Sequence, residues 1–236
     1  MQPFFRLGLS LGAALLLSSS LSFAASIFND TFTDPPHVTG LAVDLPKWNE
    51  ISGNTDVINN VAWPPTSCAG SASGDNCIDT DGTPGGNAVL MRSIPSVSVS
   101  TGALYTLTFW VSGNQRTATT DSLAFSIVDG SGNAIATTSR SIAGADASLT
   151  GVDVASGNIS ILGGNSVYDW REVTLQFVSN YSGSAHIQFD ATGGGAGDQI
   201  GLILDDVNLD TPVPEPTSLA LIGAGLVLVG LRARRS

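Results

Sequence analysis

The sequence predicts an all-β fold with the architecture of a jelly-roll β-sandwich. Apolar and polar residues alternate at a period of two over many short runs, and glycine, asparagine and serine separate these runs. The central part of the chain has no long run of apolar residues at the helical period of 3.6. Many short strands joined by such turns are typical of sandwiches and jelly rolls.

The alternation is clearest in residues 103–112. Tyr105, Leu107 and Phe109 share one face of the expected strand, and Trp110 lies on the other face. A turn signal at residues 129–133 predicts that the runs on its two sides form a hairpin. Further strands are expected at residues 89–93, 97–100, 122–128, 134–139, 171–179, 184–190 and 200–209. Residues 53–86 and 143–168 are rich in small and polar residues and are expected to be loops.

The N-terminus has the plan of a secretory signal peptide. A basic residue precedes an apolar run from Leu7 to Leu17, and small residues follow up to Ala25. We therefore expect residues 1–25 to be removed, with cleavage after Ala24 or Ala25. The alternative is an uncleaved membrane anchor, for which this apolar run is short.

The C-terminal segment, residues 211–236, is different again. Its parts, in order, are Pro214-Glu215-Pro216, an apolar run at 217–231, and the basic residues Arg232, Arg234 and Arg235. The apolar run would be about 22 Å long as a helix, whereas a bilayer core is about 30 Å thick. The arginines favour a cytoplasmic C-terminus. We expect a transient membrane helix, with a permanent anchor as the alternative.

The body between these ends, residues 26–210, has the size of one β-rich domain. It holds five of the nine basic residues and 19 of the 20 acidic ones, so its formal charge is −14. This charge makes nucleic acid and anionic membrane surfaces poor partners, so we expect no nucleic acid to bind. Such an acidic, lysine-poor composition is typical of extracellular proteins and is compatible with divalent cations.

The two cysteines, Cys68 and Cys77, flank a loop of glycine, serine and asparagine. In an exported chain this spacing favours a disulfide. The alternative is a pair of free thiols, and no histidine lies near enough in sequence to suggest a metal site.

The C-terminal triplet, apolar helix and terminal arginines together resemble the PEP-CTERM sorting signal of Gram-negative bacteria. The resemblance covers about 24 residues. It implies that an exosortase, a membrane protease, processes the chain near Pro214, Glu215 and Pro216. It also implies export through the inner membrane, transient anchoring there, and release to the cell surface or extracellular matrix with exopolysaccharide or biofilm.

The body more loosely resembles the galactose-binding-like jelly-roll modules, including the DUF642-type group. The motifs that carry the resemblance are Asn29-Asp-Thr-Phe32, Asp79-Thr-Asp-Gly-Thr-Pro-Gly-Gly86, Tyr105-Thr-Leu-Thr-Phe109, Val173-Thr-Leu-Gln-Phe177 and Leu204-Asp-Asp-Val207. The family's acidic residue after the first phenylalanine is replaced by Thr33, which weakens the expectation of a family-type metal site.

Two groups of residues are candidates for binding. Trp110 beside threonines could stack on a sugar ring, with Asn114, Gln115 and Arg116 at the end of the same strand. The alternative is a tryptophan covered by a loop.

Asp205 alternates with Val207 and Leu209, so we expect it to point inward, where a carboxylate needs a partner. With Asp30 it could hold a structural calcium, the one cofactor that the sequence suggests. A structural aspartate that accepts backbone hydrogen bonds is the alternative.

These observations predict a non-catalytic, exported protein that binds carbohydrate or exopolysaccharide. One alternative is a purely structural or adhesive matrix protein without a small ligand. A glycan-active enzyme is a further alternative, but the sequence has no nucleophile-elbow or zinc-protease motif.

Overall fold

The computed structural model describes residues 24–33, 40–59, 68, 76–83, 88–144, 146–164, 169–193 and 201–212. All of them belong to one compact unit, Ala24–Pro212. Most of the expected signal peptide and the whole apolar run at 217–231 lie outside the described residues. Within the described residues, no helix is long and apolar enough to cross a membrane.

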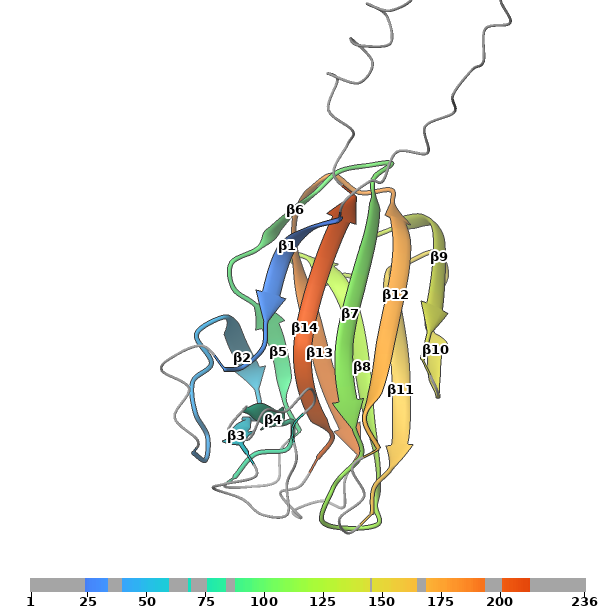
Figure 1. The fold of residues 1–236 in the computed structure, drawn as a ribbon. Coiled ribbons are helices and arrows are strands. Elements are labelled where there is room, and N and C mark those ends of the chain that lie inside the picture. Colours follow the sequence, from blue (N-terminus) through green and yellow to red (C-terminus); the bar gives the residue numbers. More distant parts are fainter. Residues whose placement is uncertain are drawn as a thin grey trace, which may run out of the picture. The chain divides into compact units, whose positions relative to one another are not determined.

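The strands of this unit form two antiparallel sheets of seven strands each (Figure 1). Sheet A has the order β3 (Asp56–Ile58), β4 (Cys77–Asp79), β14 (Ile203–Pro212), β7 (Leu104–Ser112), β12 (Arg171–Ser179) and β9 (Thr137–Ala143), and β1 (Ala24–Asp30) also pairs with β14. Sheet B has the order β10 (Ala147–Leu149), β11 (Ser156–Leu162), β8 (Thr120–Asp129), β13 (Gly183–Gly193), β5 (Leu90–Ser93) and β2 (Trp48–Ser52), and β6 (Val97–Val99) also pairs with β13. The expected all-β sandwich is confirmed.

The core lies between the two sheets and follows the period-two pattern. Leu107 and Phe109 of β7 are fully buried, as are the inward residues of β8 and β13. The Phe109 ring meets the rings of Phe125 and Phe189 edge-on, with centroids 4.9 and 5.1 Å away. In the long strands the residues between these core positions point to the outer faces and are mostly polar.

The expected loop at residues 143–168 is wrong, because it contains β10 and β11. Strand β11 is hard to recognise because glycine occupies its first inward position. A Cβ on Gly157 would lie 2.5 Å from the Phe125 ring, so the close packing of β11 on β8 needs a glycine there. Its later inward residues, Ile159 and Ile161, are buried as in the other strands.

Two further expectations need correction. The segment 53–86 contains β3 and β4, which have three residues each and are buried on both faces, so they show no alternation. The expected hairpin partner of β8 also differs. Only Ala134 bridges to Val128, and β9 then joins β12 in the opposite sheet.

Candidate functional site

The outer face of sheet A carries Trp110 at its centre. In the ladders of β7 with its two neighbours, Trp110 lies opposite Asp205 of β14 and opposite Glu172 of β12. Residues that are paired in this way point to the same side of a sheet. The tryptophan is partly exposed and Glu172 is exposed, so an aromatic ring and a free carboxylate lie side by side at the surface.

Asp205 is buried, as expected, but on the opposite side of the sheet from the expected one. Leu204 pairs with Val111 and faces the core, so Asp205 faces outward. A bulge follows, in which Asp206 has a φ of 49°. This bulge returns Val207 to the core. The predicted regular alternation fails because one extra residue is inserted in the strand.

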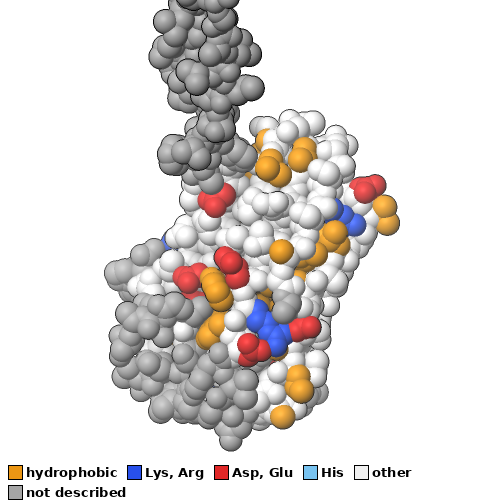
Figure 2. Space-filling model, turned by 45° about the vertical axis from the view of Figure 1, so that its right-hand side comes forward, with side chains coloured by type: hydrophobic (Ala, Val, Ile, Leu, Met, Phe, Trp, Pro, Cys, Tyr) orange, Lys and Arg blue, Asp and Glu red, His pale blue; other side chains and the backbone are white. Residues whose placement is uncertain are grey.

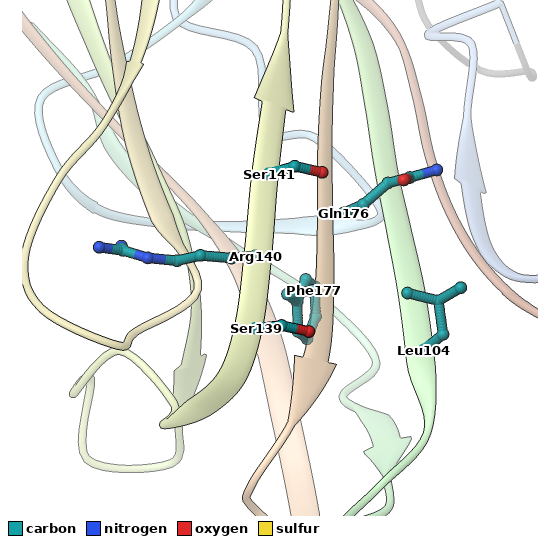
Figure 3. Close-up of a pocket in the computed structure, with 6 residues that line it drawn as sticks. All are labelled: Leu104, Ser139, Arg140, Ser141, Gln176 and Phe177. Atoms are coloured by element: carbon teal, nitrogen blue, oxygen red, sulfur yellow. The ribbon is translucent and has the colours of Figure 1, made fainter.

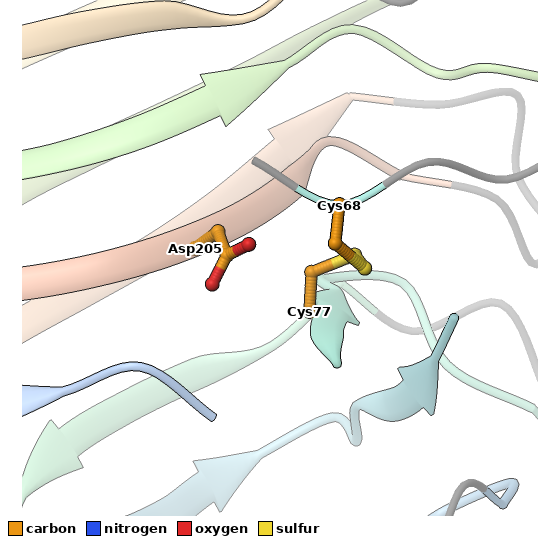
Figure 4. Close-up of side chains that lie close together, drawn as sticks. All are labelled: Cys68, Cys77 and Asp205. Atoms are coloured by element: carbon orange, nitrogen blue, oxygen red, sulfur yellow. A yellow bond between two sulfur atoms is a disulfide. The ribbon is translucent and has the colours of Figure 1, made fainter. Parts of the chain in front are cut away.

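The disulfide covers Asp205. Cys68 and Cys77 are bonded to each other, and their sulfur atoms lie within 4.8 Å of an Asp205 carboxylate oxygen (Figure 4). Ile58 and Ile203 complete a small apolar cluster around the disulfide. Sulfur atoms in a disulfide are not thiolates, so this grouping is not a metal site as it stands.

Asp30 is engaged elsewhere. Its Oδ2 accepts a 2.7 Å hydrogen bond from Trp48 Nε1, and its Oδ1 accepts one from the backbone N–H of Phe32. The Lys47 ammonium lies 3.5 Å from Oδ1. Protein donors and a cation already surround this carboxylate. Among the described residues, the potential metal ligands close to Asp205 are Cys68 and Cys77, and Asp30 is not one of them. The two residues therefore do not fit a shared calcium site.

Asn114, Gln115 and Arg116, in the loop after β7, make structural contacts in this arrangement. Asn114 and Gln115 are buried, and the Asn114 amide donates to the Thr117 hydroxyl over 2.8 Å. Arg116 reaches back to β4, where its Nη2 lies 2.7 Å from Asp79 Oδ2. None of the three lies beside Trp110 in the pairing of sheet A, so the expected grouping with Trp110 does not form.

The Asp79–Arg116 pair was not expected from the sequence. Asp79 is fully buried, and its Oδ1 also accepts hydrogen bonds from the N–H groups of Gly201 and Asp81. Burial raises the pKa of Asp79 from 3.8 to about 7, although the hydrogen bonds and Arg116 lower it. This carboxylate joins β4 to the segment before β14 and to the loop after β7.

Polar side chains continue along the outer face of sheet A from Trp110. Thr108 pairs with Thr174, and Thr106 pairs with Gln176, so all four point outward. The row ends at a hollow of about 270 Å³ beside β9 (Figure 3). Leu104, Ser139, Arg140, Ser141, Gln176 and Phe177 line this hollow. We call Trp110, Glu172, Thr108, Thr174, Thr106 and Gln176 the Trp110 face.

The Trp110 face and the hollow at its end together suit an extended ligand. Leu104 and Trp110 are six residues apart on β7, which corresponds to about 20 Å along a strand. Figure 3 shows that Arg140 is directed away from Gln176 and Leu104. Its guanidinium donates to backbone oxygens that include those of Thr150 and Gly151, so it closes the sandwich edge and leaves the hollow uncharged.

The few basic side chains on the visible surface lie close to acidic ones, and further acidic side chains stand apart from them (Figure 2). In Figure 2, hydrophobic side chains are scattered among uncharged ones. Arg171, for example, contacts Asp146 and Asp169. Glu172, the next residue, has no such ion pair among the described residues and remains free for a ligand.

Comparison with known proteins identifies one family model and several solved structures. The PEP-CTERM protein-sorting motif matches residues 212–235. No curated protein matches the sequence.

Two of the similar solved structures each share 14% identity with the chain. The TmCBM61 structure in complex with β-1,4-galactotriose has a TM-score of 0.39, over 72% of this chain and 98% of that one. The CBM22-1 xylan-binding domain from Paenibacillus barcinonensis Xyn10C has a TM-score of 0.41, over 83% and 99%.

The chain thus carries a PEP-CTERM sorting motif directly after β14, which ends at Pro212. This motif indicates secretion with a C-terminal sorting signal and a location at the cell surface or outside the cell.

Proposed function

We propose that this is a non-catalytic protein that a Gram-negative bacterium exports and an exosortase sorts, and that it binds a carbohydrate, such as an exopolysaccharide, through the Trp110 face. Residues 1–25 act as the signal peptide, residues 26–210 as the binding domain and residues 211–236 as the sorting signal. The apolar run at 217–231 holds the protein in the inner membrane until exosortase processing.

The observation that carries the binding proposal is the cross-strand pair of Trp110 and Glu172 on a sheet face whose other residues are polar. An indole ring offers an apolar plane for the C–H face of a sugar and an N–H that can donate to a hydroxyl. The adjacent carboxylate accepts hydrogen bonds from sugar hydroxyls. The threonines and Gln176 supply further partners along the same line.

The non-catalytic part of the proposal is supported by the sequence, which has no nucleophile-elbow or zinc-protease motif. Detectable turnover of a glycan by the purified protein would contradict this part of the proposal.

Binding is tested with Trp110→Ala, and Leu162→Ala serves as the matched control. Leu162 is an exposed apolar residue of sheet B, so its truncation removes surface without touching the Trp110 face. Affinity gel electrophoresis with soluble polysaccharides should show weaker retardation for Trp110→Ala alone, while circular dichroism shows that both variants are folded. If the wild type and both variants bind none of the polysaccharides, the chain is better described as a structural or adhesive matrix protein.

Sorting is tested by deleting residues 214–236. We expect the deletion to abolish exosortase-dependent processing while the domain stays folded, because the ladder of β1 with β14 ends at Pro212. Processing that is unchanged after the deletion would contradict the assignment. Unfolding of the truncated protein would show that the tail belongs to the core.

A further inference from the structure

The outer face of sheet B carries a groove of about 240 Å³ that shares no residue with the Trp110 face. Its floor is made of small residues of β8, because Ser126 lies between Ser156 of β11 and Gln188 of β13, and Ala124 lies between Asn158 and Asp190 of the same strands. Asp190 pairs with Ala124 and lines the same groove. Small side chains on the middle strand and longer polar ones on β13 produce the hollow.

Asp190 is held in this groove without a protein partner. Within the residues that the structure describes, no hydrogen bond or ion pair reaches its carboxylate, and burial alone raises its pKa. A partly buried carboxylate without a partner costs folding free energy. Such a group is a candidate for ligand binding, because the ligand supplies the missing donors.

The basic residue Arg92 lies beside the groove, where Gln188 and Gly132 of its lining position it, and no ion pair with Asp190 forms among the described residues. Arg92 Nε donates a 2.7 Å hydrogen bond to Gln188 Oε1. A Cβ on Gly132 would lie 2.0 Å from Arg92 Nη2, so the guanidinium packs against a position that only glycine leaves open. Because its oxygen is occupied by Arg92, Gln188 presents its amide N–H groups as the free part of the side chain.

The chemistry of the groove favours an uncharged ligand. Its lining includes the anion of Asp190, and the cation of Arg92 lies beside it on Gln188, whereas the body as a whole has a formal charge of −14. The body repels polyanions, and Arg92 disfavours cationic groups. Hydroxyl groups, in contrast, can donate to the carboxylate and accept from the amide and guanidinium. No phenylalanine, tyrosine or tryptophan points outward from the described residues of β8, β11 and β13, so hydrogen bonds must supply the affinity.

We infer that this groove binds a segment of an uncharged, hydroxyl-rich polymer, a neutral polysaccharide, and that one copy of the protein can thereby cross-link two chains. The groove and the Trp110 face lie on the outer faces of the two opposing sheets, so two chains can bind without competing for space. The cross-linking rests on the proposed function of the Trp110 face, whereas binding in the groove does not.

The test uses three soluble neutral probes: galactomannan, mixed-linkage β-glucan and dextran. Asp190→Ala should reduce the affinity of the exported protein for at least one probe by about tenfold, the usual effect of losing hydrogen bonds to a charged group. Its thermal stability should stay equal or rise, because a partly buried carboxylate without a partner among the described residues is removed. Thr192→Ala, on the same strand outside the groove, is the matched control and should bind as the wild type does.

The cross-linking is measured as the rise in viscosity of a probe solution on adding protein. The wild-type protein should raise the viscosity. Each of the two variants, Asp190→Ala and Trp110→Ala, should bind the polymer but leave the viscosity unchanged, because each keeps only one binding site. Asp190→Ala that binds and cross-links like wild type overturns the inference and leaves the Trp110 face intact. If Trp110→Ala alone binds normally, the Trp110 face fails and the groove stands. Wild type that binds without cross-linking, or that binds none of the probes, overturns the two-site inference.

Discussion

Trp48 Nε1 donates a 2.7 Å hydrogen bond to Asp30 Oδ2 inside the sandwich and so joins β2 of sheet B to β1 of sheet A. The indole also packs edge-on against Phe28 and stacks on Phe32. Phe32 has a φ of 53°, and the hydrogen bond from its N–H to Asp30 Oδ1 stabilises this turn. One carboxylate thus holds both the sheet contact and the end of β1.

The first prediction concerns this carboxylate. Asp30→Ala should lower the free energy of unfolding by about 2–4 kcal/mol, because two buried N–H groups lose their acceptor. Asp30→Asn keeps an oxygen acceptor and should cost less. Urea denaturation measures both, with Asn29→Ala as the control, because Asn29 is the exposed neighbour on β1. Equal stability of Asp30→Ala and wild type would show that the bond to Trp48 contributes little.

The second prediction concerns calcium. A calcium ion that binds only the folded protein, at 100 times its Kd, would stabilise it by about 2.7 kcal/mol. Because Asp30 already faces two donors and Lys47, and Asp205 lies against the disulfide, we expect the same melting temperature in calcium chloride and in EDTA. A melting temperature several degrees higher in calcium, lost in Asp30→Asn, would restore the calcium site that the sequence suggests.

The third prediction concerns pH. The pKa of Asp79 is about 7 in the folded protein, above its ordinary value of 3.8. Between pH 3.8 and 7, Asp79 is therefore protonated in the folded state and ionised in the unfolded state. The resulting stability is fully present at low pH and is lost as the pH rises towards 7, with a slope of at most about 1.4 kcal/mol per pH unit. The free energy of unfolding of wild type should therefore fall between pH 5 and 8 relative to that of Asp79→Asn.

Arg116→Gln provides the matched variant for this measurement. Removal of the cation 2.7 Å from Asp79 raises the pKa of Asp79 further, so the loss of stability should extend to higher pH and be largest at pH 8. A difference between wild type and Asp79→Asn that does not change between pH 5 and 8 would contradict the raised pKa. Glu50 and Asp190, whose pKa values burial also raises, are present in all three proteins and cancel in the comparison.

The sequence predicts the long strands well because each buries one face. In β7 the buried Leu107 and Phe109 alternate with outward threonines, and this pattern depends only on the strand itself. Strand β11 escapes prediction because the inward position of Gly157 is determined by the Phe125 ring of another strand. The period of two thus reveals a strand only where side chains, and not a close backbone contact, fill the core.

In the candidate site, too, the sequence predicts what depends on one strand alone and misses what depends on contacts between strands. Trp110 lies on the outer face as its alternation predicts, but Arg116 is directed to Asp79 of β4, which is 37 residues away in sequence. Only the pairing of β4 with β14, next to β7, brings them together. The exposed Glu172 beside Trp110 could have been inferred from the alternation in β12, since it precedes the inward Val173.

The last prediction concerns the bulge that turns Asp205 outward. Asp206 has a φ of 49°, in the left-handed region, where a β-branched residue is strained by about 1–2 kcal/mol. Asp206→Val should therefore lower the free energy of unfolding by at least about 1 kcal/mol, whereas Asp206→Gly should leave it within about 0.5 kcal/mol. Thr211, later on β14, has no positive φ, so valine should be tolerated better than glycine there. If valine is tolerated better than glycine at both positions in urea denaturation, the strand runs without a bulge in solution and Asp205 faces the core with Val207.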